Sequence, residues 1–569
     1  MNDDDRAVIL LAHSAPAEGA DLARLVEAHF YGKYQVLLAP APAQPGAMLE
    51  HLDQEGRRVA AVLVDERLPD DAKQTLLPRV PQECRLLLAH RPGVEQGGVR
   101  SVPRALGERE EDFWVPLHQA LYDTVTPDDV KATVRGNWQN KRFSTILRFL
   151  LLNLVTCKLD LQPDATDVKV DLTVGTQAEQ HFTNPTLAQL VAPLGLNTYK
   201  PEVNYDVVIV GGGPASLSAA VNLTSLFQLK VLIIEKFALG GEAATAINTI
   251  ENYLGFPKGI SAYDLARLWR QHTDKYDTYI HRLLCYSAKQ IQSTITAGKI
   301  TYTLTASPNE DERVTARPDI DQDVKVTTGV VLIASGLKPR RLAPSTQAQE
   351  YEGQGVYYDA LPGDTDLYDP TKDTIAIVGA GDTAGRAAAL FAAKKIHVDL
   401  LVRGDNLNDM IPELRAEIAN YAQAGTIKIN YKTEVTTVAK NSTTHKIQLT
   451  LSSASSPLEV SDLYVLIGGQ ADTKWLDASG VDLQKCKGEW FGCVRTGADV
   501  CRDTPDMQSS LPGVFAAGDV RSGSVRRISA AVGEGGAVAI AIYKYFTTKP
   551  KVLQAAKDTP TSVYFTHSP

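Results

Sequence analysis

Short apolar runs alternate with longer helix-like stretches along most of the chain. Four such runs, AVILLAH, YQVLLAP, VAAVLVD and CRLLLAH, lie within the first 90 residues. Strands that are buried on both faces of a parallel sheet are continuous apolar runs of this length, and helices fill the connections between them. The pattern therefore predicts an α/β protein that begins with a small doubly wound domain, residues 1–125.

Three further parts follow along the chain. Residues 126–200 predict a second small unit, in which the strand-like VKATVRG, CKLDL and VKVDLTV accompany the helix-like FSTILRFLLLNLV and LAQLVAPLGL. Beyond it, two apolar runs each lead into a glycine-rich segment and a helix pattern, as in Rossmann-like domains. We expect one such domain to be built from residues 203–347 and 471–569, and the other from residues 348–470.

The two glycine-rich segments match the G-x-G-x-x-G fingerprint, with a small residue in place of the third glycine. In this fingerprint the first glycine permits a tight turn, the second lets a pyrophosphate approach the backbone, and the third position allows close helix packing. The diphosphate then lies at the positive N-terminus of the helix. Both copies therefore predict a dinucleotide site. The three positions are Gly211, Gly213 and Ser216 in YDVVIVGGGPASLSAA, and Gly379, Gly381 and Ala384 in DTIAIVGAGDTAGRAA.

A charged residue follows each fingerprint at the same spacing but with opposite sign. Glu235 ends the run KVLIIE twenty-four residues after Gly211, and Arg403 ends HVDLLVR twenty-four residues after Gly379. An acid at this place hydrogen-bonds ribose hydroxyls of FAD or NAD, whereas an arginine pairs with the 2′-phosphate of NADP. The alternative for Arg403 is a solvated loop residue, because Gly404 and Asp405 follow it. Two different nucleotides in one chain predict electron transfer between them.

Composition narrows the class of protein. The net charge is −9 and the chain carries no long Lys/Arg tract, so we expect no nucleic-acid partner. The N-terminus MNDDDRAV has no apolar signal region, and the apolar stretch at 146–155 is far too short to span a bilayer. Six cysteines without a C-x-x-C motif indicate a reducing compartment, and no pattern of metal ligands stands out. We therefore expect a soluble, cytoplasmic protein without a metal.

From Tyr205 to Phe546 the sequence resembles the thioredoxin-reductase-like FAD/NAD(P) oxidoreductases. The landmarks occur in the family's order, although Glu242 replaces a glutamine and Ser335 a threonine. This resemblance implies FAD, a nicotinamide nucleotide (NADP or NAD) and a homodimer. The matching segments are GGGPA (211–215), GGE (240–242), IENYLGF (250–256), VVLIASGLKPR (330–340) and GVFAAGDVR (513–521).

The same resemblance implies which residues bind the two nucleotides. Asp519 would hydrogen-bond the ribityl or pyrophosphate part of FAD, and the helix that starts near Arg527 would direct its positive end at the flavin and stabilise the reduced form. The flavin carries the chemistry, so no side chain is assigned as catalytic. The FAD residues are Gly211, Gly213, Pro214, Ala215, Ser216, Glu235, Lys236, Gly240, Gly241, Glu242, Asn252, Ala334, Ser335, Gly336, Gly518, Asp519, Arg527 and Ile528. The NAD(P) residues are Gly379, Gly381, Asp382, Thr383, Ala384 and Arg403.

The redox dithiol of the family is missing. Relatives carry C-A-T-C before the NADPH fingerprint, whereas this chain has Tyr358, Asp359, Ala360 and Leu361 there. A thiol–disulfide relay needs an attacking thiolate and a resolving partner, so this segment cannot act by the family mechanism. The family also has two consecutive arginines after its NADPH strand, and here only Arg403 remains. Later cysteines offer a substitute dithiol or, alternatively, inert thiols: Cys486, Cys493 and Cys501.

The N-terminal parts resemble two modules that have lost their chemistry. VLVDERLP (62–69) resembles the acceptor strand of response-regulator receivers, with Asp65 at the acceptor position, but Ala12, His13 and Ser14 replace the acidic pair that binds Mg²⁺. Residues 1–125 are therefore interpreted as a flavodoxin-like pseudo-receiver. Residues 126–200 resemble a glutaredoxin-like module without its cysteines, in which Cys157 belongs to the core. The four-part order resembles bacterial fused response regulator/thioredoxin-disulfide reductases.

Three functions are compatible with these patterns. The first is an FAD-dependent oxidoreductase that moves electrons from NAD(P)H to a non-dithiol acceptor such as a quinone, ferredoxin or oxygen. The second is a non-enzymatic flavin-binding redox sensor, and the third is a disulfide reductase that uses the late cysteines or a partner's thiols. In the relatives the NAD(P) domain rotates, so we expect hinges near residues 345–350 and 468–472.

Overall fold

A computed structural model describes five strands and a few further residues of the first 130, and most of residues 131–558. The residues fall into two compact units, Met1–Asn137 with Val155–Asn184, and Trp138–Leu154 with Pro185–Pro569. Each unit is described by itself. In residues 1–130 the structure describes 7–13, 23, 34–40, 48–49, 52, 59–65, 85–89 and 100–103. In residues 131–558 it describes all residues except 138–139, 163–164, 174–178, 246–249, 258, 297, 309–321, 361, 445 and 485–491.

The first unit contains two sheets. One is fully parallel, and its order β2-β1-β3-β4-β5 is that of flavodoxin-like doubly wound proteins. Its strands are β1 (Ala7–His13), β2 (Tyr34–Pro40), β3 (Val59–Asp65), β4 (Arg85–Ala89) and β5 (Arg100–Pro103). In the other sheet, of order β7-β6-β8-β9, only β6 and β7 are parallel. Its strands are β6 (Ala132–Gly136), β7 (Cys157–Leu161), β8 (Lys169–Leu172) and β9 (Gln180–Thr183).

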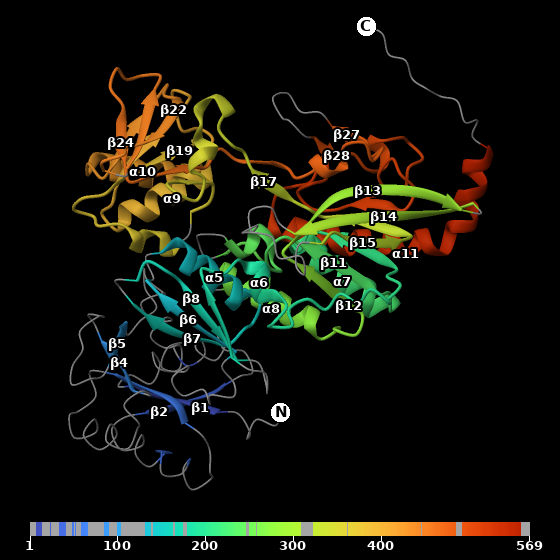
Figure 1. Ribbon diagram of the computed structural model, residues 1–569, viewed down its shortest axis with the longest axis horizontal. Helices are drawn as coiled ribbons and strands as arrows, with labels where there is room; N and C mark the ends of the chain where they lie inside the picture. Colours follow the sequence, from blue (N-terminus) through green and yellow to red (C-terminus); the bar gives the residue numbers. More distant parts are fainter. Residues whose placement is uncertain are drawn as a thin grey trace. The chain divides into compact units, whose positions relative to one another are not determined.

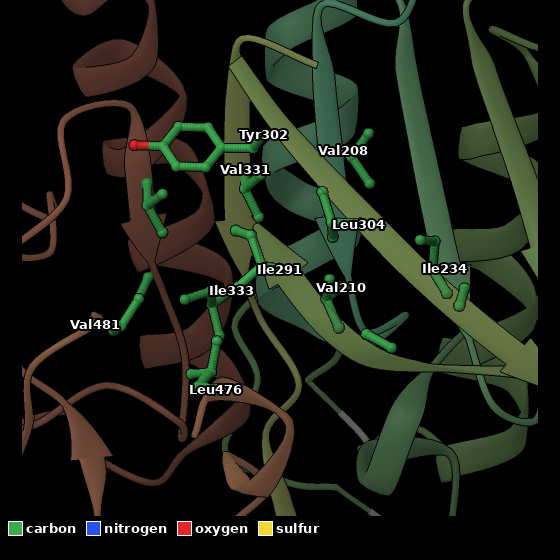
Figure 2. Packing of buried hydrophobic residues seen from close by; sticks show 14 of the residues in the cluster. Val208, Val210, Ile234, Ile291, Tyr302, Leu304, Val331, Ile333, Leu476 and Val481 are labelled. Carbon is green, nitrogen blue, oxygen red and sulfur yellow. The ribbon is translucent and has the colours of Figure 1, made fainter. Parts of the chain in front are cut away.

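The second unit contains a parallel sheet of order β12-β11-β10-β16-β29, with α7 and α11 packed against each other (Figure 1). The antiparallel sheet β13-β14-β15 covers the core, where Tyr302 and Leu304 belong to the same buried cluster as Val208 and Ile333 (Figure 2). The elements are β10 (Val207–Val210), α7 (Pro214–Phe227), β11 (Val231–Glu235), η5 (Gly241–Thr245), α8 (Ala262–Asp274), β12 (Ile280–Leu284), β13 (Tyr286–Thr296), β14 (Lys299–Pro308), β15 (Val324–Thr328), β16 (Val330–Ile333), β29 (Val514–Ala516) and α11 (Ile528–Asp558).

A second sheet of the same kind follows in this unit. Its order is β18-β25-β19-β20-β21, all parallel, and the antiparallel sheet β22-β23-β24 accompanies it. The repeated apolar run, glycine turn and helix thus fold twice into the same arrangement. The elements are β18 (Val356–Tyr357), η9 (Pro362–Leu367), β19 (Thr374–Val378), α9 (Asp382–Ala393), β20 (His397–Leu401), α10 (Pro412–Gln423), β21 (Ile427–Asn430), β22 (Val435–Lys440), β23 (Ile447–Leu451), β24 (Leu458–Val460) and β25 (Asp462–Val465).

The chain passes between the two sheets through a pair of antiparallel strands, β17 and β26. The second expected hinge, 468–472, contains β26, whereas the first, 345–350, falls on short 3-10 helices beyond β17. The Ser335 hydroxyl also donates a hydrogen bond to the Asp472 carbonyl, 2.9 Å away, beside this crossing. The remaining elements are β17 (Leu337–Pro339), η7 (Pro344–Thr346), η8 (Ala348–Tyr351), β26 (Gly469–Ala471), η10 (Lys474–Leu476), β27 (Leu483–Gln484), β28 (Cys493–Val494) and η11 (Gly497–Asp499).

Two helices from the expected unit 126–200 group with the second unit instead, namely α5 (Lys141–Leu152) and α6 (Leu187–Val191). Asn140 caps α5, because its side chain accepts the Arg142 N–H at 2.9 Å. The Thr186 and Gln189 pair forms a capping box at α6. Among the described residues, no helix combines the length and the apolar character that crossing a bilayer requires.

Candidate functional site

The first fingerprint forms a turn whose first position only glycine can occupy. Gly211 directly follows β10 and has φ +105°, and a Cβ there would collide with the carbonyl oxygen of Ala334. Gly213 is the N-cap of α7 and has no atom within 4 Å of a Cβ built on it. Pro214 begins the helix, so the turn leaves the positive helix end beside open space. This is the geometry that a bound diphosphate requires.

Glu235 stands at the end of β11 and is held by backbone donors. The Gly212 N–H donates to Oε2 at 2.6 Å and the Phe237 N–H donates to Oε1 at 2.9 Å. Burial raises the pKa of Glu235, and the positive charge of Lys236 with these donors opposes that rise. A carboxylate has about four acceptor positions, so capacity remains for ribose hydroxyls. The structure thus brings Glu235 to the same turn as Gly211 and Gly213.

Some of the remaining predicted FAD residues are in contact with this turn. Gly240 and Gly241 both have positive φ, and a Cβ on Gly241 would lie 2.8 Å from the Cα of Gly213. Ser216 is fully buried, and its hydroxyl has no hydrogen-bond partner in the structure. An orphaned buried hydroxyl beside an open glycine turn fits a site for a polar ligand. The other residues on these segments are Ala215, Lys236, Asn252, Ala334, Ser335 and Gly336.

The segment after β29 meets the first turn. A Cβ on Gly518, whose φ is +76°, would lie 2.9 Å from the Cβ of Ala215, so the two segments are in close contact. The Gly518 N–H donates to Glu534 Oε2 at 2.7 Å, and Glu534 forms a bidentate pair with Arg521, at 2.7 and 3.0 Å. Sequence reasoning missed this pair. The only signal was that both residues lie in the G-D-V-R and G-E-G-G segments next to assigned positions.

Charged groups converge on Asp519. Burial raises the pKa of Asp519 to about 6, repulsion from Glu242 and Glu534 adds to this, and Arg526 and Arg527 oppose it. Burial also raises the pKa of Glu242, against the positive charges of Lys236 and Arg526. Three carboxyl groups and two arginines therefore act on one another around the start of α11, which begins at Ile528.

Replacement of Asp519 by asparagine should stabilise the apoprotein at neutral pH. Because folding raises the pKa of this carboxyl from about 3.8, the ionised form costs stability as the pH rises through 4 to 6, and the cost is complete above that. The full shift corresponds to about 3 kcal/mol, and solvent screening at this partly exposed site leaves about 1 kcal/mol. Thermal melts of apoprotein should show D519N higher by about 2 °C at pH 7.5 and equal at pH 4. A lower melting temperature at pH 7.5 would contradict this assignment.

The second fingerprint repeats the geometry of the first. Gly379 directly follows β19 and has φ +151°, and a Cβ there would collide with the carbonyl oxygen of Leu466. Gly381 is the N-cap of α9 and is surrounded by open space. Asp382 accepts the Ile411 N–H at 2.9 Å, while Thr383 and the buried Ala384 complete the first turn of α9. Arg403 follows β20 and is exposed, so it can reach either a ligand or solvent.

Residues 358–360 lie in the segment where the family resemblance places a dithiol, and they take part in other contacts. The Arg341 guanidinium lies 5.2 Å from the ring centroid of Tyr358 and forms a bidentate pair with Glu352. Tyr358 Oη is buried without a hydrogen-bond partner, and Ala360 is buried. Leu361 lies outside the described residues. The described part of this segment therefore provides packing and one buried hydroxyl, not a redox group.

The late cysteines do not form a disulfide among the described residues. Cys493 is buried in β28 and Cys501 is exposed, whereas Cys486 lies outside the described residues. Cys157 is also buried, as expected for a core residue, and burial raises the pKa of its thiol strongly. A thiol whose ionisation is suppressed in this way is a poor nucleophile.

One group of ligand-type side chains occurs in the first unit. Ligand atoms of Asp171, Glu179 and His181 lie within 4.8 Å of one another. Arg135 already pairs with the Asp171 carboxylate, and His181 Nδ1 is 2.7 Å from the same carboxylate. Because these partners already occupy the one buried carboxylate, we assign no metal to this group.

The two matched folds, with open glycine turns at both helix N-termini, define a dinucleotide-binding α/β protein. The family of pyridine nucleotide-disulphide oxidoreductases matches residues 205–535. The chain belongs to this family, and membership implies FAD and NADPH as cofactors. The residues of both turns fit a bound dinucleotide, because each turn excludes a Cβ at the first glycine and leaves space at the second.

Individual relatives are similar to the same part of the chain. A 34.2 kDa protein in the rubredoxin operon of Clostridium pasteurianum is 27% identical over 352 residues, which cover 62% of this chain and 100% of the relative. NADPH-dependent thioredoxin reductase 3 of Arabidopsis thaliana is 26% identical over 356 residues, covering 61% of this chain and 59% of the relative. The crystal structure of T. acidophilum thioredoxin reductase has 24% identity and a TM-score of 0.47, and covers 61% of this chain and 100% of that one.

Proposed function

We propose that the chain is an FAD-dependent oxidoreductase that takes electrons from NAD(P)H and passes them to an acceptor other than a protein dithiol. The observation that carries this proposal is the pair of matched glycine turns in one unit, together with Tyr358, Asp359 and Ala360 at the place of the dithiol. The Arabidopsis relative is named as NADPH-dependent, which supports a nicotinamide donor.

The residues of the first turn would hold FAD. Backbone N–H groups at the N-terminus of α7 bind the diphosphate beside Gly213, and Glu235 accepts hydrogen bonds from the ribose. Gly518 and Asp519 would hold the ribityl or pyrophosphate part, and the positive end of α11 near Arg527 would stabilise the reduced flavin. When bound, FAD supplies the acceptance of hydride and the onward transfer of electrons.

The residues of the second turn would hold the nicotinamide nucleotide. The N-terminus of α9, from Gly381 to Ala384, binds its diphosphate, and Arg403 pairs with a 2′-phosphate if the nucleotide is NADPH. The paired strands β17 and β26 are the crossing about which this domain would rotate. The homodimer implied by the resemblance and a cytoplasmic location belong to the same proposal.

A panel of candidate electron acceptors tests the proposed acceptor class. Purified holoprotein should oxidise NADPH with a quinone, ferredoxin or oxygen, and it should leave thioredoxin disulfide unreduced, because the Tyr358–Asp359–Ala360 segment offers no thiolate. Reduction of thioredoxin disulfide faster than of every other acceptor would overturn the proposed acceptor class. The same assay without acceptor measures the background.

Replacement of Cys493 by serine should leave turnover unchanged within about twofold, because a buried thiol of this kind contributes no nucleophile. NADPH oxidation with the best acceptor measures this, and Cys157→Ser, which removes a buried thiol outside the late group, is the matched control. A tenfold loss in Cys493→Ser at an unchanged melting temperature would instead support the third function, a disulfide reductase that uses the late cysteines.

A flavin-binding redox sensor is the second candidate. The observation that favours it lies in the N-terminal part. Its sheet has the flavodoxin-like strand order and β3 ends at Asp65, but the sequence lacks the acidic pair expected after β1. The sheet β7-β6-β8-β9 belongs to the segment that resembles a glutaredoxin without cysteines. In this case NAD(P)H would change the spectrum or oligomeric state of the protein without turnover.

A further inference from the structure

Helix α5 lies against the segment that carries the ribose-binding carboxylate of the proposed FAD site. The ring of Phe149 meets the ring of Phe237 edge to face, with centroids 5.6 Å apart. The guanidinium carbon of Arg148 lies 5.7 Å from the centroid of the same Phe237 ring. Two consecutive residues of α5 therefore contact one side chain two positions beyond Glu235.

The C-terminal end of α5 is anchored in the same domain by a buried polar network. Asn153, which caps the helix, accepts a hydrogen bond from Arg270 at 3.1 Å and donates one to the Phe149 carbonyl at 2.8 Å. Arg270 is almost fully buried on α8 and is paired with Asp274, which also binds Arg282 at 2.7 Å. Because removing one member of a buried charge network is costly, this anchor fixes where α5 lies.

Acidic groups also act on Arg148. Burial lowers the pKa of Arg148, whereas the carboxylates of Asp359 and Asp364 raise it. Asp364 is buried, and Asp359 stands at the place of the missing dithiol. The guanidinium over Phe237 therefore lies in the field of two carboxylates.

Phe237 in turn holds Glu235, because its backbone N–H donates to Glu235 Oε1 at 2.9 Å. We propose that α5 is a positioning element of the FAD site, in which Arg148 and Phe149 fix Phe237 and thereby the carboxylate that receives the ribose. This inference rests on the proposed FAD site. Since β6 ends at Gly136 and β7 begins at Cys157, the helix also belongs to a chain segment that continues into the first unit.

The test measures FAD affinity of the full-length apoprotein by flavin fluorescence. Arg148→Gln should raise the FAD Kd by about threefold to tenfold, the loss expected for a partly buried cation over an aromatic ring. Arg148→Lys, which keeps the charge but not the planar group, should give a smaller rise. The matched control is Lys275→Gln, which removes a cation 5.5 Å from the ring of Tyr276 instead of Phe237, and its Kd should not change.

A double-mutant cycle separates positioning from a general structural effect. In a Glu235→Gln background, Arg148→Gln should raise the Kd further by less than about twofold, because both changes act through the same carboxylate. Fully additive losses, or an unchanged Kd in Arg148→Gln, would overturn the inference. If the wild-type apoprotein itself binds no FAD, the proposed function fails, and that outcome is distinguishable because it precedes any variant.

Discussion

Replacement of Gly213 by aspartate should abolish FAD binding without destabilising the apoprotein. Gly213 is the N-cap of α7, its φ of −77° is accessible to any residue, and no atom lies within 4 Å of a Cβ built there. Aspartate is a favoured N-cap, so the helix should gain about 0.5 kcal/mol or remain unchanged. The new carboxylate would occupy the space of the diphosphate and repel it, and the FAD Kd should rise at least roughly 100-fold.

Flavin fluorescence titration of the apoprotein measures the loss, and a thermal melt measures the stability. Gly381→Asp is the matched control, because Gly381 is likewise an N-cap with open space for a Cβ but belongs to the second fingerprint. FAD bound by Gly213→Asp with wild-type affinity would mean that the first turn is not the flavin site. A melt lowered by several degrees would mean that the turn does not tolerate a side chain.

Replacement of Gly381 by aspartate should weaken binding of the nicotinamide nucleotide while FAD remains bound. Gly381 is the N-cap of α9 with φ −93°, again in open space, so this change is the counterpart of Gly213→Asp in the second sheet. The variant should retain bound FAD, while the rate of flavin reduction by NADPH falls at least roughly 100-fold, since a carboxylate now opposes the diphosphate of the nicotinamide nucleotide.

Stopped-flow reduction under anaerobic conditions measures this rate, and dithionite reduction of the same sample shows that its flavin is intact. If Gly381→Asp lost FAD, the two turns would not act as separate sites. If it were reduced at the wild-type rate, NADPH would bind elsewhere.

Both glycine turns could be predicted from the sequence because their requirements are local. A positive φ at Gly211 and Gly379, and a carbonyl that blocks a Cβ at each, are consequences of a strand that turns directly into a helix. Glu235 could be predicted for the same reason, since it ends the next strand. The all-parallel sheet of residues 7–103 also agrees with the α/β domain that the apolar runs predicted, although those runs alone gave no strand order.

The contacts between distant segments could not be predicted. The pair of Arg521 and Glu534 joins a loop to α11, and its geometry depends on how both pack on α7. The position of α5 depends on Arg270, 117 residues beyond Asn153. No periodicity or motif reports such pairings, because each side chain alone is compatible with a solvated surface. For Arg403 the exposed position leaves the two sequence-based interpretations open.

We propose above all that one chain holds FAD and a nicotinamide nucleotide that exchange electrons. An anaerobic titration of the purified holoprotein, first with NADPH and then with NADH, tests this by the absorbance of oxidised flavin at about 450 nm. We expect rapid bleaching by one equivalent of nucleotide, with NADPH the faster if Arg403 binds its 2′-phosphate. A yellow protein that neither nucleotide bleaches, although dithionite does, would contradict this electron transfer and favour the redox sensor.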